Sequence, residues 1–156
     1  MRVLRVYADT SVFGGPFDEE FADASRRLFN AIDQGRFRLV TSGLVEQELA
    51  QAPKQVQEFF IKTAANAELV EPSTDAVSLR DAYVSLGVVS ESYLADALHV
   101  ALATVAGCDL IVSWNFKHIV NYRKIRQYNA VNALKGYGEI AIHSPLEVVD
   151  SENQDI

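Results

Sequence analysis

Cysteine is scarce in the sequence, and long hydrophobic runs are missing altogether. The 156 residues include a single cysteine, Cys108, which can form neither an internal disulfide nor a cysteine-rich zinc site. This composition is typical of a reducing compartment, and we expect a cytoplasmic protein. No stretch reaches the roughly 18 uncharged apolar residues of a membrane span, and only a short apolar run precedes Asp9. We therefore expect a soluble, unprocessed chain.

Basic residues are in the minority. The chain has 14 lysines and arginines against 21 aspartates and glutamates, which gives a net charge of −7. A protein with this charge does not, as a whole, attract nucleic acid or an anionic membrane surface. Any site for a polyanion must therefore be local.

The composition is otherwise that of a globular protein. Apolar and aromatic residues of all kinds make up 49% of the chain and charged residues 22%, which excludes extensive disorder. A chain of this length is expected to form one domain around one core. We predict a single domain over residues 1–150, followed by a short polar tail at residues 151–156.

Apolar strand patterns alternate with helical patterns along the chain. Strands are predicted at residues 2–8, 36–41, 68–71 and 109–114. Helices are predicted from Asp18 to a cap at Gly35, from an N-cap at Ser42, over 53–67, from 74 to Gly87, and over 91–106 before Gly107. The cluster Gly14-Gly15-Pro16 predicts a loop, and one or two helical turns are expected within 117–127. The alternation predicts an α/β fold with three α/β/α layers and a mainly parallel central sheet.

Four polar residues are predicted to meet at the carboxyl edge of that sheet. Asp9 and Asn115 directly follow predicted strands, whereas Glu48 and Asp96 fall in the first turns of predicted helices. Crossover helices run back antiparallel to the strands, so their first turns share this edge, where open parallel sheets bind ligands. Carboxylates gathered there repel one another unless a cation lies among them. Oxygen donors without a cysteine set or a histidine pair favour Mg²⁺ or Mn²⁺ over zinc.

Each of these residues also has an ordinary structural explanation. Between Tyr93 and Ala106 the only ionisable side chains are those of Asp96 and His99, and a carboxylate near a helix N-terminus interacts favourably with the helix dipole. Asp9 fits a turn that closes a strand. Glu48 fits a solvated helix position, and Asn115 fits a turn or cap. The joint placement of all four at one edge favours a functional site.

Four short motifs follow one another over about residues 5–120: YADTSVFGG, TSGLVEQELAQ, ESYLADALHVALA and CDLIVSWNFKHI. Together they resemble the motif series of the PIN domain, in particular the VapC-like toxin ribonucleases of bacterial toxin–antitoxin pairs. The resemblance implies an endoribonuclease whose acidic quartet binds Mg²⁺ or Mn²⁺ and hydrolyses RNA. By position, the quartet corresponds to Asp9, Glu48, Asp96 and Asn115, where the last residue replaces the usual aspartate.

The same resemblance implies a mechanism and a set of partners. Asp9, Asp96 and Glu48 would be the metal ligands, with Glu48 acting through water or accepting the proton of the attacking water. Thr10 or Ser11 would contact the metal shell or the scissile phosphate, although such hydroxyls equally serve as caps. The implied partners are an RNA substrate, a second copy in a homodimer, and a small antitoxin that covers the acidic cleft with a basic side chain.

Positive charge is concentrated between Leu110 and Gly138. This segment has no acidic residue and a net charge of +5, and aromatic residues interleave with its basic ones. The mixture suits phosphate contacts and stacking on unpaired bases, but buried aromatics beside a solvated basic face explain it equally well. The candidate substrate-binding residues here are Lys117, Arg123, Lys124 and Arg126, and the aromatics are Trp114, Phe116, Tyr122, Tyr128 and Tyr137.

Two other functions share features of this pattern. Phosphoaspartate proteins also use an aspartate after the first strand, but they need a second acid two residues later or an acidic pair before it. Ser11 and Ala8 occupy these places, so both patterns fail. A catalytically weak or inactive PIN-like scaffold that acts through protein or RNA binding stays open, because Asn115 carries no charge.

Overall fold

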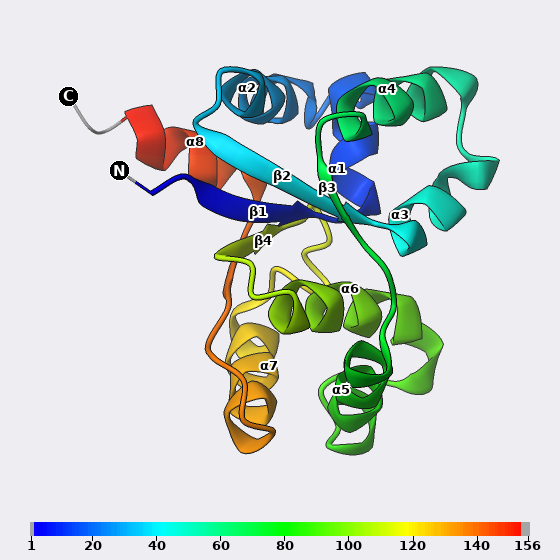
Figure 1. The fold of residues 1–156 in the computed structure, drawn as a ribbon, viewed down its shortest axis with the longest axis vertical. Coiled ribbons are helices and arrows are strands. Elements are labelled where there is room, and N and C mark those ends of the chain that lie inside the picture. The colour runs from blue at the N-terminus through cyan, green and yellow to red at the C-terminus, as the bar shows by residue number, and fades with distance from the viewer. Residues whose placement is uncertain (1, 154–156) are drawn as a thin grey trace.

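A five-stranded sheet forms the centre of the computed structural model, which describes residues 2–153; Met1 and residues 154–156 lie outside the described range. All strands are parallel and lie in the order β3-β2-β1-β4-β5 (Figure 1). The four predicted strands correspond to the first four, and the parallel sheet confirms the predicted class. The strands are β1 (Leu4–Ala8), β2 (Phe37–Ser42), β3 (Glu68–Val70), β4 (Leu110–Val112) and β5 (Ala141–His143).

Helices cover both faces of the sheet, which confirms the three predicted layers (Figure 1). None of the described helices is long and apolar enough to cross a membrane. One face carries α1 (Thr10–Gly14), α2 (Ala22–Asp33), α4 (Lys54–Ala64) and α8 (Pro145–Asn153), and α3 (Gly43–Glu48) directly follows β2. The other face carries α5 (Thr74–Ser85), α6 (Leu94–Val105) and α7 (Tyr122–Leu134). Short 3₁₀ helices span Gly15–Phe17, Leu49–Gln51 and Glu91–Tyr93.

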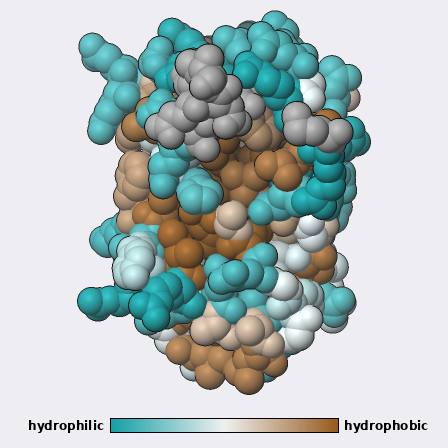
Figure 2. Space-filling view, turned by 90° about the vertical axis from the view of Figure 1, so that its left-hand side faces the viewer, coloured by the Kyte–Doolittle hydropathy of each residue, from teal (hydrophilic) through white to brown (hydrophobic). Residues whose placement is uncertain are grey.

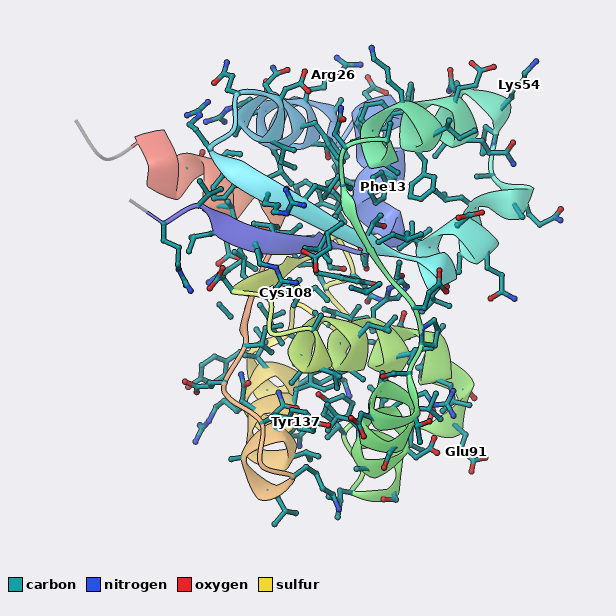
Figure 3. The ribbon with its side chains drawn as sticks, viewed as in Figure 1. Phe13, Arg26, Lys54, Glu91, Cys108 and Tyr137 are labelled. Carbon is teal, nitrogen blue, oxygen red and sulfur yellow. The ribbon has the colours of Figure 1, made fainter. Side chains whose placement is uncertain are left out.

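The strands contribute side chains to two separate hydrophobic cores. Val6 and Ala8 of β1 pack in the core beneath α1, α2 and α4, whereas Tyr7 between them packs in the core of α5, α6 and α7. This alternation follows from the two-residue period of a strand. In Figure 3, Phe13 lies on one side of the sheet and Tyr137 on the other, each within the layer of its own core.

Local sequence signals set several helix ends. Gly87 and Gly107 follow the ends of α5 and α6 with φ angles of 83° and 70°, a conformation that glycine adopts without a Cβ clash. Both were predicted caps. The Ser42 hydroxyl accepts a hydrogen bond from the backbone N–H of Val45, which confirms the predicted N-cap of α3.

Three segments differ from the sequence-based expectation. The predicted loop at Gly14-Gly15-Pro16 instead lies in α1 and in the 3₁₀ helix that follows it, because Val12 and Phe13 are fully buried against the sheet. The next helix therefore begins at Ala22 rather than at Asp18. Helix α7 is 13 residues long where one or two turns were expected, since few of its side chains are buried and its apolar pattern is weak. Residues 151–153 of the predicted tail continue α8, and the rest of that tail lies outside the described residues.

The surface beside the edge strand β5 is hollowed. Val120, Ile125, Ile140 and Ile142 are among the side chains around a hollow of about 630 Å³. Figure 2 shows hydrophobic side chains gathered in the middle of the face that forms the left-hand side of Figure 1. Among the described residues, none of the four predicted edge residues lines this hollow, whereas Tyr122 of the predicted RNA-binding segment does.

The order of the strands reverses at β1. The chain proceeds from β1 to β2 and β3 on one side, and then returns to β4 and β5 on the other. The carboxyl ends of β1 and β4 therefore form the switch point at which open parallel sheets bind ligands. Ala8 pairs with Val112, so the residues that follow the two strands leave the sheet side by side.

Truncation of Ile111 tests the packing of the central strand β4. Ile111 is fully buried, so Ile111→Ala should lower the free energy of unfolding by about 2–5 kcal/mol through lost burial and a residual cavity. Ile61→Ala is the matched control, since Ile61 is 69% exposed and its loss should cost less than about 0.5 kcal/mol. Urea unfolding followed by circular dichroism measures both. Equal losses in the two variants would contradict the described packing.

Candidate active site at the carboxyl edge of the sheet

Asp9 is a buried carboxylate at the switch point, with 4% of its surface exposed. The Ser11 hydroxyl donates to its Oδ1 and the Ser113 hydroxyl to its Oδ2, both at 2.6 Å. Its side chain makes no capping bond to α1, so the turn explanation does not account for it. Burial raises the pKa of Asp9 and the charge of Asp96 adds to the increase, while His99 and the two serines oppose it. A carboxylate that is costly to ionise is characteristic of functional sites.

Asp96 lies in the first turn of α6, within electrostatic reach of Asp9. The side chain is half-buried and has no hydrogen-bond or ion-pair partner among residues 2–153. Burial lowers the pKa of His118, and the negative charge of Asp96 opposes this effect. Asp96 is therefore within electrostatic reach of both Asp9 and the segment that follows β4.

Glu48 is the last residue of α3, and its side chain is 32% exposed. Its Oε1 accepts a hydrogen bond from the Thr10 hydroxyl at 2.6 Å and lies 2.6 Å from Nε2 of His99. Burial raises the pKa of Glu48, but the hydrogen bonds from His99 and from the Thr10 hydroxyl outweigh burial and lower this pKa below its usual value. Glu46 instead borders a groove beside Phe60, so Glu48 is the glutamate that faces the site.

Asn115 has the capping role that its sequence position also allowed. Its side-chain oxygen accepts from the backbone N–H groups of Lys117 at 3.2 Å and His118 at 2.9 Å. The residue of this segment that binds Asp9 is Ser113, which donates a hydrogen bond to it. The Ser113 hydroxyl also accepts from the backbone N–H of Asn115 at 2.9 Å. Asn115 as a fourth site residue thus stays a prediction.

The donors at this edge suit a hard cation with most of its hydration retained. Among residues 2–153, no three acidic, histidine or cysteine side chains lie close enough together to hold one ion. Mg²⁺ is commonly held by one or two carboxylates plus waters, and Asp9 with Asp96 can supply two. The three-ligand set with Glu48 stays a prediction, because Thr10 and His99 engage the carboxylate of Glu48.

Of the predicted basic residues, Lys117, Arg123 and Arg126 are exposed, whereas Lys124 is half-buried. Nζ of Lys124 donates to the backbone oxygen of Val88 at 2.7 Å, so it ties α7 to the loop after α5. The charges of Lys117 and Lys124 act on His118, as does that of Asp96. Part of the basic segment therefore adjoins the acidic edge.

The aromatic residues of that segment differ in exposure, and Tyr137 is partly buried against the core of α5, α6 and α7. Trp114 and Tyr128 are buried core residues, which corrects the interpretation that all five aromatics interleave with the cations to stack on bases. Phe116 is 50% exposed and Tyr122 is 79% exposed, and Arg126 lies over the Tyr122 ring at 5.9 Å. Only the exposed aromatics are available to a ligand.

Comparison with known proteins identifies the family. The sequence matches the PIN domain family model over residues 6–119. The chain belongs to the PIN domain family. PIN domains are generally nucleases. No curated protein is similar enough in sequence to count as a match.

Solved structures confirm the PIN-like fold. Thirteen chains of solved structures match, among them one from the crystal structure of VapBC2 from Rickettsia felis bound to a DNA fragment from their promoter. The two chains share 13% sequence identity with a TM-score of 0.58, and the similarity covers 90% of this PIN domain and 98% of that chain. At this identity, the likeness concerns the fold.

Two residues of the site escaped the sequence analysis. Ser113 gave no signal, because a hydroxyl at the end of a strand is common. His99 gave a partial one: it lies three residues after Asp96 in an otherwise apolar helix of this PIN domain, and residues at that spacing share a helix face. Nothing in the sequence indicated that Glu48 would be its partner.

Asp9→Asn tests the cost of the buried charge in the PIN domain. Burial raises the folded-state pKa of Asp9, so the folded state loses stability as pH rises from the ordinary carboxyl pKa through the raised one. The uncharged variant escapes this loss, and its stability relative to wild type should grow over that range. Urea unfolding in chelator at about pH 4 and about pH 8 measures the difference. The exposed Asp33→Asn variant controls for the substitution itself, and a pH-independent difference for Asp9→Asn would refute the buried charge.

Proposed function

We propose that this PIN domain is a metal-dependent endoribonuclease that hydrolyses RNA phosphodiester bonds, and that it is the toxin of a type II toxin–antitoxin pair. The observation that carries the proposal is the buried Asp9 carboxylate, under the charge of Asp96, at the switch point of the sheet. Two carboxylates in one site favour a bound cation. A phosphodiester would add further negative charge at the same place.

Asp9 and Asp96 would hold Mg²⁺ or Mn²⁺ in this proposal. A cation held there would lower the pKa of a water and neutralise charge on the phosphate. Ser11 and Ser113 fix both oxygens of Asp9 before any ligand arrives. The partnerless Asp96 carboxylate needs to break no bond before it binds.

Glu48 would accept the proton of the attacking water. The lowered pKa keeps it ionised at neutral pH, as a base requires. Thr10 and Ser11 donate to Glu48 and Asp9, so each would reach the scissile phosphate only by exchanging that bond. Their more direct role is to orient the carboxylates.

The exposed cations Lys117, Arg123 and Arg126 would bind the RNA backbone, and Phe116 and Tyr122 would stack on unpaired bases. Lys117 adjoins His118, on which the charge of Asp96 also acts. This proximity supports an RNA strand that runs from the basic surface to the acidic edge.

A catalytically weak scaffold that acts through protein or RNA binding is the second candidate. The observation in its favour is Asn115, which brings no charge and whose side-chain oxygen is engaged by two backbone N–H groups. The site would then have one acid fewer than the usual quartet.

The proposed partners follow from the toxin assignment. The fold likeness to a chain of the VapBC2 complex supports a VapC-like protein that is inhibited by a small antitoxin. A basic antitoxin side chain would complement an acidic edge on a chain of net charge −7. A homodimer and a cytoplasmic location belong to the same proposal.

Asp96→Asn tests the nuclease directly. Removing one of two metal-binding charges should reduce Mn²⁺-dependent RNA cleavage by at least about 100-fold. Asp33→Asn, at the end of α2, is the matched control and should cleave like wild type. Equal cleavage by wild type and Asp96→Asn would point to a contaminating nuclease and favour the inactive scaffold.

Charge reversal tests the RNA surface. Lys117→Glu with Arg123→Glu, in an Asp96→Asn background that prevents cleavage, should weaken RNA binding. The slope of log K against log salt should fall by about 0.7 for each lost phosphate contact on single-stranded RNA. The charge-matched control is Lys54→Glu with Lys62→Glu on α4. An unchanged slope in the first variant would exclude this surface from the RNA footprint.

A further inference from the structure

A chain of hydrogen bonds links the two ends of helix α3 through the protein interior. It begins where the backbone N–H of Val45 donates to Oγ of Ser42, at 3.3 Å. Ser42 Oγ lies 2.8 Å from the Tyr7 hydroxyl, which lies 2.8 Å from Nδ1 of His99. Nε2 of His99 lies 2.6 Å from Oε1 of Glu48. The chain thus passes through β1 and α6 before it returns to the last residue of α3.

The inner members of this chain are shielded from water. Ser42 and Tyr7 have no exposed surface and His99 has 2%, whereas the Glu48 side chain is 32% exposed. Burial raises the pKa of the Tyr7 hydroxyl above its usual value, so this group keeps its proton. Buried polar groups need partners within the protein, and these four side chains partner one another.

The available donors and acceptors allow the hydrogen bonds of this chain to run in only one direction. The Glu48 carboxylate can only accept, so Nε2 of His99 carries the proton that lies between them. Nδ1 then accepts from Tyr7, and the Tyr7 oxygen accepts from Ser42. A proton on both ring nitrogens would reverse the inner bonds and leave the buried Ser42 hydroxyl proton without an acceptor among the described residues.

We propose that His99 is a positioning residue that holds Glu48 for the reaction. Its Nε2–H, fixed in that tautomer by Tyr7, and the Thr10 hydroxyl both bind Oε1 of Glu48. No hydrogen bond from residues 2–153 reaches Oε2, which is left to accept the proton of the attacking water. This inference rests on the proposed nuclease function.

The placement of His99 gives α6 two roles in the site. Asp96 and His99 are three residues apart and share one face of the helix. The helix thus supplies one acid and holds the acid of another element. Partners that orient a catalytic or metal-binding group in this way commonly contribute about 10–100-fold to activity or metal affinity.

Nuclear magnetic resonance of the imidazole nitrogens tests the hydrogen-bond chain. The protein has three histidines, and in chelator at neutral pH one of them should show the pure Nε2–H tautomer. Loss of this signal in His99→Gln assigns it to His99. Tyr7→Phe removes the donor to Nδ1 and should shift the signal toward a mixture of tautomers. A wild-type His99 that is protonated on Nδ1 would overturn the proposal.

Cleavage kinetics test the positioning role. His99→Leu keeps the bulk but removes the donor, and kcat should fall by about 10–100-fold with little change in KM. His99→Gln keeps an N–H group near the place of Nε2 and should recover most of the rate. The control His143→Gln, on the exposed end of β5, should match wild type. If His99→Leu fails to fold, the cleavage rates of His99→Gln and Tyr7→Phe are compared instead. His99→Gln should cleave faster, because only this variant retains a fixed donor to Glu48.

The outcomes separate this inference from the proposed function. Full activity in His99→Leu, or equal losses in the folded His99→Leu and His99→Gln proteins, contradicts positioning while leaving the nuclease intact. A wild-type protein that cleaves no RNA contradicts the nuclease and, with it, a catalytic role for His99. The tautomer then still shows whether His99 donates to Glu48.

Discussion

The buried charge of Asp9 is the constraint on which the arrangement of the site depends. Transfer of a carboxylate out of water costs several kcal/mol, and the hydrogen bonds that Ser11 and Ser113 donate to Asp9 offset part of this free energy. These two serines come from segments that follow different strands. Asp9 can therefore be held in this way only where β4 lies beside β1 and where α1 begins directly after Asp9. The local geometry of the site and the order of the sheet depend on the same contacts.

A second set of contacts joins Glu48, the more exposed acid of the site, to the protein interior. Glu48 ends a six-residue helix and would have considerable rotational freedom by itself. Bonds from Thr10 and His99 to one of its oxygens connect it to α1 and α6, on opposite faces of the sheet. The carboxyl edge is thus the place where the two helical layers meet through polar groups. Each hydrophobic core fixes one layer, and the site depends on both.

The sequence predicted the sheet and its edge well, because both follow from local patterns. Apolar runs gave the first four strands, and helix ends at Gly87 and Gly107 followed from their capping chemistry. A loop was predicted at Gly14-Gly15-Pro16, but helical turns form there because tertiary packing buries the neighbouring Val12 and Phe13. The charge of the basic segment was predicted correctly, but the exposure of its aromatic residues was not. Only burial in the folded protein distinguishes Tyr128 from Tyr122.

Sequence patterns were sufficient to predict the alternation of strands and helices, the parallel sheet, and the placement of Asp9, Glu48 and Asp96 near its carboxyl edge. These features follow from the periodicity of each segment and from the common direction that the alternation imposes on the strands. The hydrogen bonds from Ser113, rather than Asn115, to Asp9 and between His99 and Glu48 became visible only in the folded protein. Hydrogen bonds over distances of about 3 Å depend on side-chain positions that no local pattern specifies.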